Sequence, residues 1–179
     1  MKSPRRRVDG FTIIEIVVTI SVAGILMAIA VPAFNTFIQN QRLATVTNSL
    51  VLSLNFARSE AIKRDTATGI TVCASTDQQN CNGAGWNDGW LVADVTNNSC
   101  TLQGVPKIGT QNTVSEVAGP GQLVLVFQSN GAAASAASFT ICDSRGAAYA
   151  HSIDLSPTGR AVSSGTPGQT ISGGALACP

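Results

Sequence analysis

The stretch Gly10-Phe11-Thr12-Ile13-Ile14-Glu15 decides how the rest of this chain is organised. It opens an apolar run that continues to Val31, and Glu15 is the only charged residue within that run. A helix rises about 1.5 Å per residue, so a run of this length crosses a hydrocarbon core of about 30 Å. An ionised side chain at mid-membrane costs about 3 kcal/mol on insertion scales, so Glu15 requires a functional explanation.

The residues before this run are basic, with positive charges at Lys2, Arg5, Arg6 and Arg7. Positive charges beside a membrane helix favour the cytoplasmic side, which places the chain after Val31 outside the cytoplasm. The formal net charge of +1 is unevenly distributed, because the first ten residues carry four basic groups and one acidic group. The remainder is slightly acidic, so it has no general electrostatic attraction for nucleic acid, and only a local basic patch would bind it.

A long helix is predicted from about residue 11 to about residue 64, ended by residues 65–69. Pro32 lacks an amide hydrogen and is expected to bend the helix rather than stop it, because the helical periodicity resumes afterwards. After the proline, apolar residues recur every three or four positions and define one helical face. These residues are Leu43, Val46, Leu50, Leu54, Ala57 and Ala61.

Beyond Gly69 the pattern changes to the two-residue period of β-strands, separated by clusters rich in Gly, Asn and Asp. The sequence therefore predicts an α+β fold, in which one long bent helix packs on an antiparallel sheet. The predicted strands are Ile70–Cys73, Gly89–Asp94, Leu123–Gln128, Phe139–Asp143, His151–Leu155 and Arg160–Ser163, with weaker candidates at Leu102–Ile108 and Ala175–Ala177. Loops are predicted at Asp77–Asp88, Asn97–Cys100 and Gly131–Ser138.

All five cysteines follow the apolar run, in the part of the chain expected outside the cytoplasm, where disulfides persist. Neither a CxxC motif nor a Cys/His pair at zinc-ligand spacing is present, so no metal site is predicted. We predict bridges between Cys73 and Cys81, which bracket a short loop, and between Cys142 and Cys178. Cys100 is then left over, and other pairings remain open.

Three explanations fit the opening stretch. It is an ordinary signal anchor, or a secretory signal cut after the small-residue site Ala28-Ile29-Ala30, or a class III leader. The third agrees with Gly10 before Phe11, with the lone Glu15 and with Pro32 after the long apolar helix. On these residues the chain closely resembles the type IV pilin and pseudopilin superfamily.

This resemblance implies that prepilin peptidase cuts between Gly10 and Phe11 and N-methylates Phe11. It also implies that Glu15 meets the terminal amine of a neighbouring subunit, and that the helix loosens near Pro32 on assembly. The chain then divides into a leader (1–10), a transmembrane and filament-core half of the helix (11–34) and a periplasmic globular domain (35–179). The protein would await assembly in the bacterial inner membrane, with its N-terminus cytoplasmic, before joining a filament in the periplasm or at the cell surface.

A second set of residues resembles the GspH/FimT branch of this superfamily. It consists of Ala57-Arg58-Ser59-Glu60-Ala61, Ile70-Thr71-Val72-Cys73 and Gly85-Trp86-Asn87-Asp88-Gly89-Trp90. Taken without the resemblance, Arg58 and Glu60 form a solvated helix face, and both tryptophans are core residues. The branch implies a minor type IV pilin that primes or joins the pilus, with other minor and major pilins as partners. The alternative within the branch is a GspH-like minor pseudopilin of type II protein secretion.

A third function, DNA capture for natural transformation, is suggested by Gly159-Arg160. FimT-type pilins that bind DNA carry a Gly-Arg-x-Arg signature near this place, but Val162 occupies the position of the second arginine. Arg145 and Lys107 are the residues that would compensate. Without DNA binding, the segment is a plain turn between two strands, with Arg160 in solvent.

Catalysis finds no support in the sequence. The single histidine, His151, has no nearby carboxylate except Asp154, and no nucleophile elbow or phosphate-binding loop is present. We therefore predict a protein that is not an enzyme, with no catalytic residue and no cofactor.

Overall fold

The computed structural model describes residues 10–65, 68–83, 85–94, 100–118 and 124–178. Some predicted segments lie partly outside the described residues. The residues concerned include 1–9 of the leader, 66–67 of the predicted helix stop and 97–99 of a predicted loop. One helix, α1 (Ile13–Arg64), holds nearly a third of the chain and confirms the predicted long helix. Internal contacts divide the chain into two compact units, residues 1–40 and residues 41–179.

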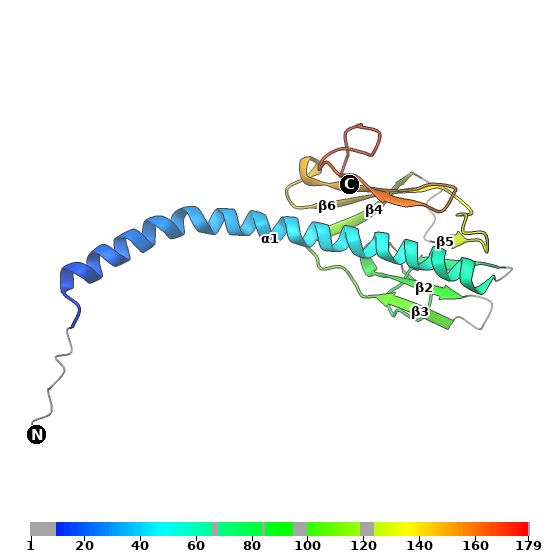
Figure 1. The fold of residues 1–179 in the computed structure, drawn as a ribbon, viewed down its shortest axis with the longest axis horizontal. Helices are drawn as coiled ribbons and strands as arrows, with labels where there is room; N and C mark the ends of the chain where they lie inside the picture. Colours follow the sequence, from blue (N-terminus) through cyan, green and yellow to red (C-terminus); the bar gives the residue numbers. More distant parts are fainter. Residues whose placement is uncertain (1–9, 66–67, 84, 95–99, 119–123, 179) are drawn as a thin grey trace, which may run out of the picture. The chain divides into compact units, whose positions relative to one another are not determined.

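In the first unit, α1 passes through Pro32 without interruption. Proline donates no backbone hydrogen bond, and the helix follows a curve in this part (blue to cyan, Figure 1). Within the described residues, α1 is the only helix long and apolar enough to cross a membrane, judged by length and composition.

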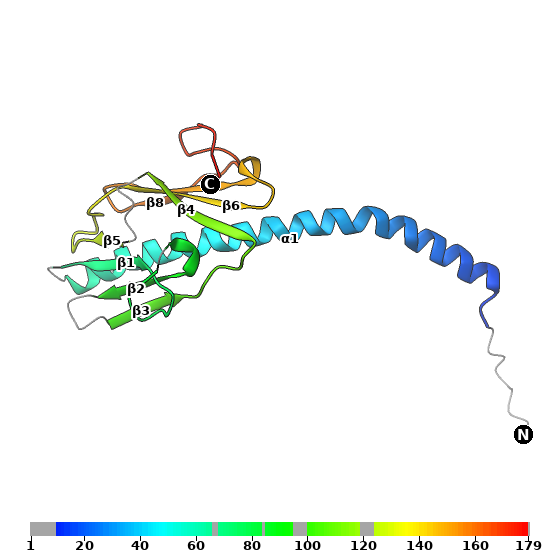
Figure 2. The ribbon, with the colours of Figure 1, turned by 180° about the vertical axis from the view of Figure 1, so that it is seen from behind.

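The second unit contains the rest of α1 and two antiparallel four-stranded sheets (Figures 1 and 2). The first sheet has the strand order β3-β2-β1-β5, and the second has the order β4-β6-β7-β8. The strands of the first sheet are β1 (Ile70–Ala74), β2 (Trp90–Asp94), β3 (Cys100–Val105) and β5 (Val124–Phe127). Those of the second are β4 (Asn112–Ala118), β6 (Ala137–Asp143), β7 (His151–Leu155) and β8 (Ala161–Ser163).

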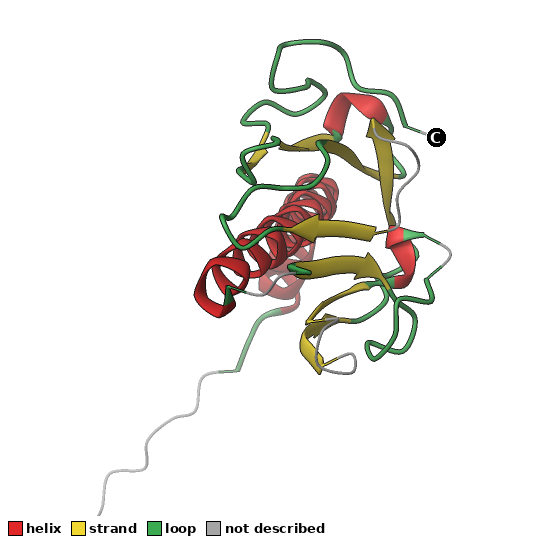
Figure 3. Ribbon diagram, turned by 90° about the vertical axis from the view of Figure 1, so that its right-hand side faces the viewer, coloured by secondary structure: helices red, strands yellow, loops and turns green. Residues whose placement is uncertain are grey.

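One hydrophobic core joins both sheets to the second half of α1 (Figure 3). The helix contributes the face predicted from the sequence, in which Leu43, Leu50 and Leu54 are fully buried and Val46 is partly buried. The strands contribute alternate residues such as Phe139 and Ile153, whose side chains point toward the helix side of the second sheet. The buried apolar face of α1 therefore packs against both sheets, and this packing holds the second unit together.

Both tryptophans are buried core residues, as the sequence suggests. Trp86 opens a short 3₁₀ helix, η1 (Trp86–Asp88), and its ring meets Phe139 edge-on with ring centroids 5.0 Å apart. Trp90 begins β2, and its indole Nε1 donates a hydrogen bond of 2.9 Å to the buried Ser53 hydroxyl on α1. Trp90 therefore fixes the register of the helix against the first sheet as well as filling space.

The six main strand predictions are confirmed to within a few residues, one strand was missed, and other predictions need correction. Strand β4 was not predicted, because its sequence Asn-Thr-Val-Ser-Glu-Val-Ala contains few large apolar residues. The predicted loop Gly131–Ser138 extends too far, since β6 begins at Ala137, and η1 lies within the predicted loop Asp77–Asp88. The weak strand at Ala175–Ala177 is wrong: Ala175 makes one isolated bridge to Gln169, next to the tight turn at Gly173 and Gly174.

Candidate functional site

The start of α1 leaves Gly10 and Phe11 outside the helix. Thr12 acts as the N-cap, because its Oγ1 accepts a hydrogen bond of 3.3 Å from the Glu15 amide. Phe11 is 79% exposed, and Gly10 is exposed with free space around its α-carbon. The bond between these two residues is therefore open to an enzyme, as cleavage at this position requires.

Glu15 lies in the first turn of α1, where a negative charge is favoured by the helix dipole. Thr12-Ile13-Ile14-Glu15 also fits the Thr-x-x-Glu pattern of a capping box, a local explanation for Glu15 that the sequence reasoning missed. Only half of the box forms: the Glu15 amide binds Thr12, but the Glu15 carboxylate has no partner among the described residues. The carboxylate thus remains available for another charge.

The first half of α1 exposes apolar side chains on all sides. A helix that is hydrophobic all round is stable only when lipid or other protein covers it. The exposed large residues are Ile13, Ile14, Ile16, Val17, Val18, Ile20, Val22, Ile25, Leu26, Met27, Ile29, Val31, Phe34 and Phe37. This surface and the single unpaired carboxylate form the main candidate site.

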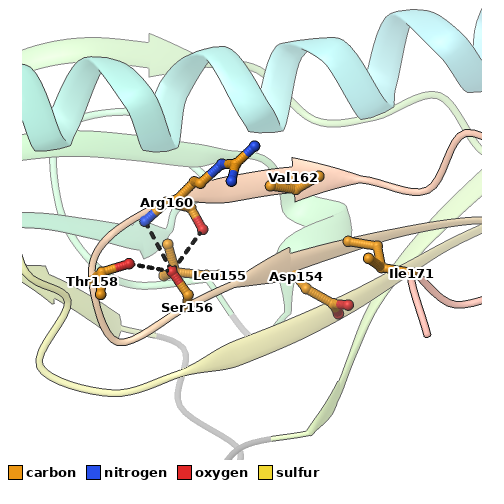
Figure 4. Close-up of a pocket in the computed structure, with 7 residues that line it drawn as sticks. All are labelled: Asp154, Leu155, Ser156, Thr158, Arg160, Val162 and Ile171. Atoms are coloured by element: carbon orange, nitrogen blue, oxygen red, sulfur yellow. Dashed lines mark hydrogen bonds between the residues drawn. The ribbon is translucent and has the colours of Figure 1, made fainter.

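The Gly159-Arg160 pair lies in the tight turn between β7 and β8 (Figure 4). The Ser156 hydroxyl accepts a hydrogen bond of 3.2 Å from the Arg160 amide, and the Ser156 amide donates a hydrogen bond of 3.0 Å to the Arg160 carbonyl. Arg160 is exposed beside a cleft of about 480 Å³, and Figure 4 shows its guanidinium pointing away from Asp154.

Gly159 has a packing role. Its φ of +76° is in the left-handed region, and a Cβ atom at this position would lie 2.0 Å from the Gly131 carbonyl oxygen. That oxygen accepts a hydrogen bond of 3.2 Å from the Nε of Arg58 on α1. Arg58 is therefore not simply solvated, as the sequence suggested, but ties the helix to a loop that the β7–β8 turn also touches.

The two cations expected to assist Arg160 are neutralised by carboxylates. Arg145 donates to the Asp143 carboxylate at 2.7 and 2.9 Å and stacks over the Tyr149 ring at 4.2 Å. Lys107 lies 3.5 Å from the Asp88 carboxylate. Because each of these charges is already paired, neither adds a free cation for phosphate binding.

The end of α1 is held by a charged network rather than by a solvated face. Glu60 is only 8% exposed, and its carboxylate pairs with Arg64 at 2.7 Å and Lys63 at 3.4 Å. Arg64 also approaches the Asp94 carboxylate of β2 at 3.6 Å, and Asp94 is 1% exposed. Sequence reasoning missed this network, because Asp94 meets the helix only through the fold.

Two disulfides join Cys73 to Cys81 and Cys142 to Cys178, the pairs named from the sequence. Cys100 begins β3, and its side chain lies outside the described part of the chain. The first disulfide closes a loop organised by Asp77, whose carboxylate accepts bonds from the Asn80 side chain and from the backbone amides of Gln79 and Asn80. These bonds hold the pKa of Asp77 well below its usual range.

In the described part of the chain, no group of three or more His, Cys, Asp or Glu side chains is arranged to hold a metal ion. His151 begins β7 and is partly buried.

An exposed apolar helix with one acidic residue, joined to an α+β unit built on its second half, defines a pilin-like protein. Comparison with family models agrees: residues 5–31 match the prokaryotic N-terminal methylation motif, and residues 46–159 match the type II transport protein GspH. The chain belongs to the GspH family.

Among solved structures, the chain is similar to the type IV minor pilin FimU of Pseudomonas aeruginosa. The match covers 70% of this chain and 90% of FimU, with 23% identity and a TM-score of 0.56. In a second crystal form of FimU the match covers 68% of this chain and 92% of FimU, with 22% identity and a TM-score of 0.55. At this identity the likeness shows the fold, which is the pilin fold. No curated protein sequence matches the chain.

Proposed function

We propose that this protein is a minor pilin, a structural subunit that primes or joins a type IV pilus. Prepilin peptidase removes residues 1–10 and N-methylates Phe11, and residues 11–34 hold the protein in the inner membrane until assembly. The observation that carries the proposal is the fully exposed apolar half of α1 with its unpaired Glu15. A helix of this kind suits lipid at first and the core of a filament afterwards.

The assembly contact follows from the charges at the start of α1. Cleavage after Gly10 creates a cationic amine on Phe11, close to the exposed carboxylate of Glu15 on a neighbouring subunit. A carboxylate in an apolar filament core is tolerated only when it is paired. Pairing between subunits thus selects helices that are correctly staggered along the filament, and the other pilins of the filament are the partners.

The alternative is a minor pseudopilin of type II secretion, which the name of the matched family favours. An epitope tag on the C-terminus of the full chain, in its native host, separates the two. We expect the tagged chain in filaments sheared from the cell surface, and we expect pilus number to fall when the gene is deleted. A chain confined to the envelope, with a deletion that blocks protein export and leaves pili intact, would establish the secretion role instead.

DNA capture is the function that the geometry supports least. Of Arg145, Lys107 and Arg160, only Arg160 has no carboxylate partner in the described residues. The acidic residue Asp154 lines the same cleft as Arg160. We expect no gel retardation of duplex DNA by the full chain in detergent micelles, even at low salt, and no difference between the wild type and Arg160→Ala. Retardation that weakens with salt and is reduced by Arg160→Ala would show that DNA binds here.

A further inference from the structure

The outer face of the second sheet, on the side away from α1, is lined by small polar side chains. Ser138 and Thr140 of β6 and Ser152 and Asp154 of β7 alternate with the core residues of those strands. The C-terminal segment, residues 165–178, lies on this outer side (red, Figure 1). It is attached by the disulfide from Cys142 and by a hydrogen bond of 2.8 Å from the Gly168 amide to the Ala150 carbonyl.

A cleft of about 220 Å³ lies between the sheet and this segment. The four polar residues of the sheet form its floor, together with Phe139, and the C-terminal segment supplies Thr170, Ser172 and Leu176 as a wall. The larger cleft beside Arg160 adjoins it, since Asp154 lines both. The small cleft thus combines five hydroxyl groups, one carboxylate and the apolar side chain of Leu176.

Two polar groups in this cleft have no partner among the described residues. Thr140 is only 2% exposed, yet its hydroxyl makes no hydrogen bond. The half-buried carboxylate of Asp154 makes neither a hydrogen bond nor an ion pair, although Arg160 lines the adjoining cleft. The hydroxyl of Ser152, a residue that is equally buried, makes only a long hydrogen bond of 3.5 Å to the Gln169 carbonyl. The hydroxyl of Thr140 and the carboxylate of Asp154 are unpaired and open to the cleft, so they are available to a ligand.

The charge in the cleft decides the class of ligand. A partly desolvated carboxylate with no counter-ion repels anions, and a neutral ligand would leave its charge unpaired. A primary ammonium is compact and has three donors, which suit the carboxylate and the hydroxyl oxygens beside it. Leu176 offers an apolar surface to the methylene stem that carries such a group.

We propose that this cleft binds the side-chain ammonium of a lysine presented by a neighbouring protein subunit. The disulfide from Cys142 to Cys178 holds the wall of the cleft in place. The identity of the partner as a filament subunit rests on the proposed function, whereas the ammonium chemistry of the cleft does not. A failure to bind ammonium would therefore leave the filament role untouched, and failure of the filament role would leave the cleft intact.

The test is saturation-transfer NMR on the full chain in maltoside detergent, which carries no ammonium group to compete. n-Butylammonium is the probe, and n-butanol is its neutral analogue of similar shape. We expect saturation transfer to n-butylammonium and much less to n-butanol. Asp154→Asn and Thr140→Val keep the size of each side chain, and we expect them to weaken n-butylammonium binding at least about tenfold and a few-fold, respectively.

Asp65→Asn, which neutralises an exposed carboxylate elsewhere, is the matched control and should bind as the wild type does. The fold of each variant is checked by its unfolding midpoint. Three results would each overturn the proposal: no transfer to n-butylammonium, equal transfer to n-butanol, or the same loss in Asp65→Asn as in Asp154→Asn.

Discussion

Replacing Gly159 with alanine is expected to lower the free energy of unfolding by about 3 kcal/mol. A left-handed backbone costs an alanine about 1–2 kcal/mol, and overpacking adds about 1–3 kcal/mol. The overlap here is with backbone, since the added Cβ would lie 2.0 Å from the Gly131 carbonyl oxygen, which cannot rotate away as a side chain does. Relief requires the two loops to separate, which also stretches the hydrogen bond from Arg58.

The measurement is denaturant unfolding of the full chain in micelles, followed by the fluorescence of the two buried tryptophans. Gly165→Ala is the matched control, because Gly165 has free space around its α-carbon and no left-handed backbone. It should unfold at nearly the wild-type midpoint. Equal midpoints for Gly159→Ala and Gly165→Ala would show that the contact with Gly131 does not constrain the turn.

Glu15→Ala is expected to reduce the amount of this protein in sheared filaments by at least about tenfold, with no loss from the inner membrane. Breaking a buried ion pair leaves an uncompensated charge and costs about 3–5 kcal/mol, which is far more than a tenfold effect on association. Removing a carboxylate from the apolar run makes the helix more stable in the membrane. The amount of protein in the filaments should therefore fall, while the amount in the inner membrane should rise.

Quantitative blots of membrane and filament fractions measure both amounts in the same cells. Glu15→Gln separates charge from size and should fail to assemble as Glu15→Ala does. Thr19→Ala, on the same exposed helix, is the control and should assemble normally, because the Thr19 hydroxyl bonds only to the carbonyl of Ile16 in its own helix. Normal incorporation of Glu15→Gln would refute the pairing role of the carboxylate.

The parts of this fold that follow local patterns were predictable. The helical period after Pro32 gave the buried face of α1, and the alternation in β6 and β7 gave most of the second sheet. Strand β4 could not be predicted, because its sequence contains few large apolar residues. Its place is set by pairing with β6 rather than by its own residues.

The functional residues also fall into two groups: those that a local motif reveals and those that only the fold brings together. Gly10, Phe11 and Glu15 are recognisable because they lie within six consecutive residues and form one local motif. The roles of Gly159 and Arg58 depend on Gly131, which reaches them only through the fold. The unpaired Asp154 carboxylate was likewise invisible, because the wall of its cleft comes from the far end of the chain.

The central claim is that this chain is processed at Gly10 and then assembled as a filament subunit. Mass spectrometry of the N-terminal peptide, from protein made in its native host, tests this claim most directly. We predict a mature chain that begins at Phe11 and carries one added methyl group on its terminal amine. A chain that retains residues 1–10, or one that begins at Val31 after cleavage at Ala30, would contradict it.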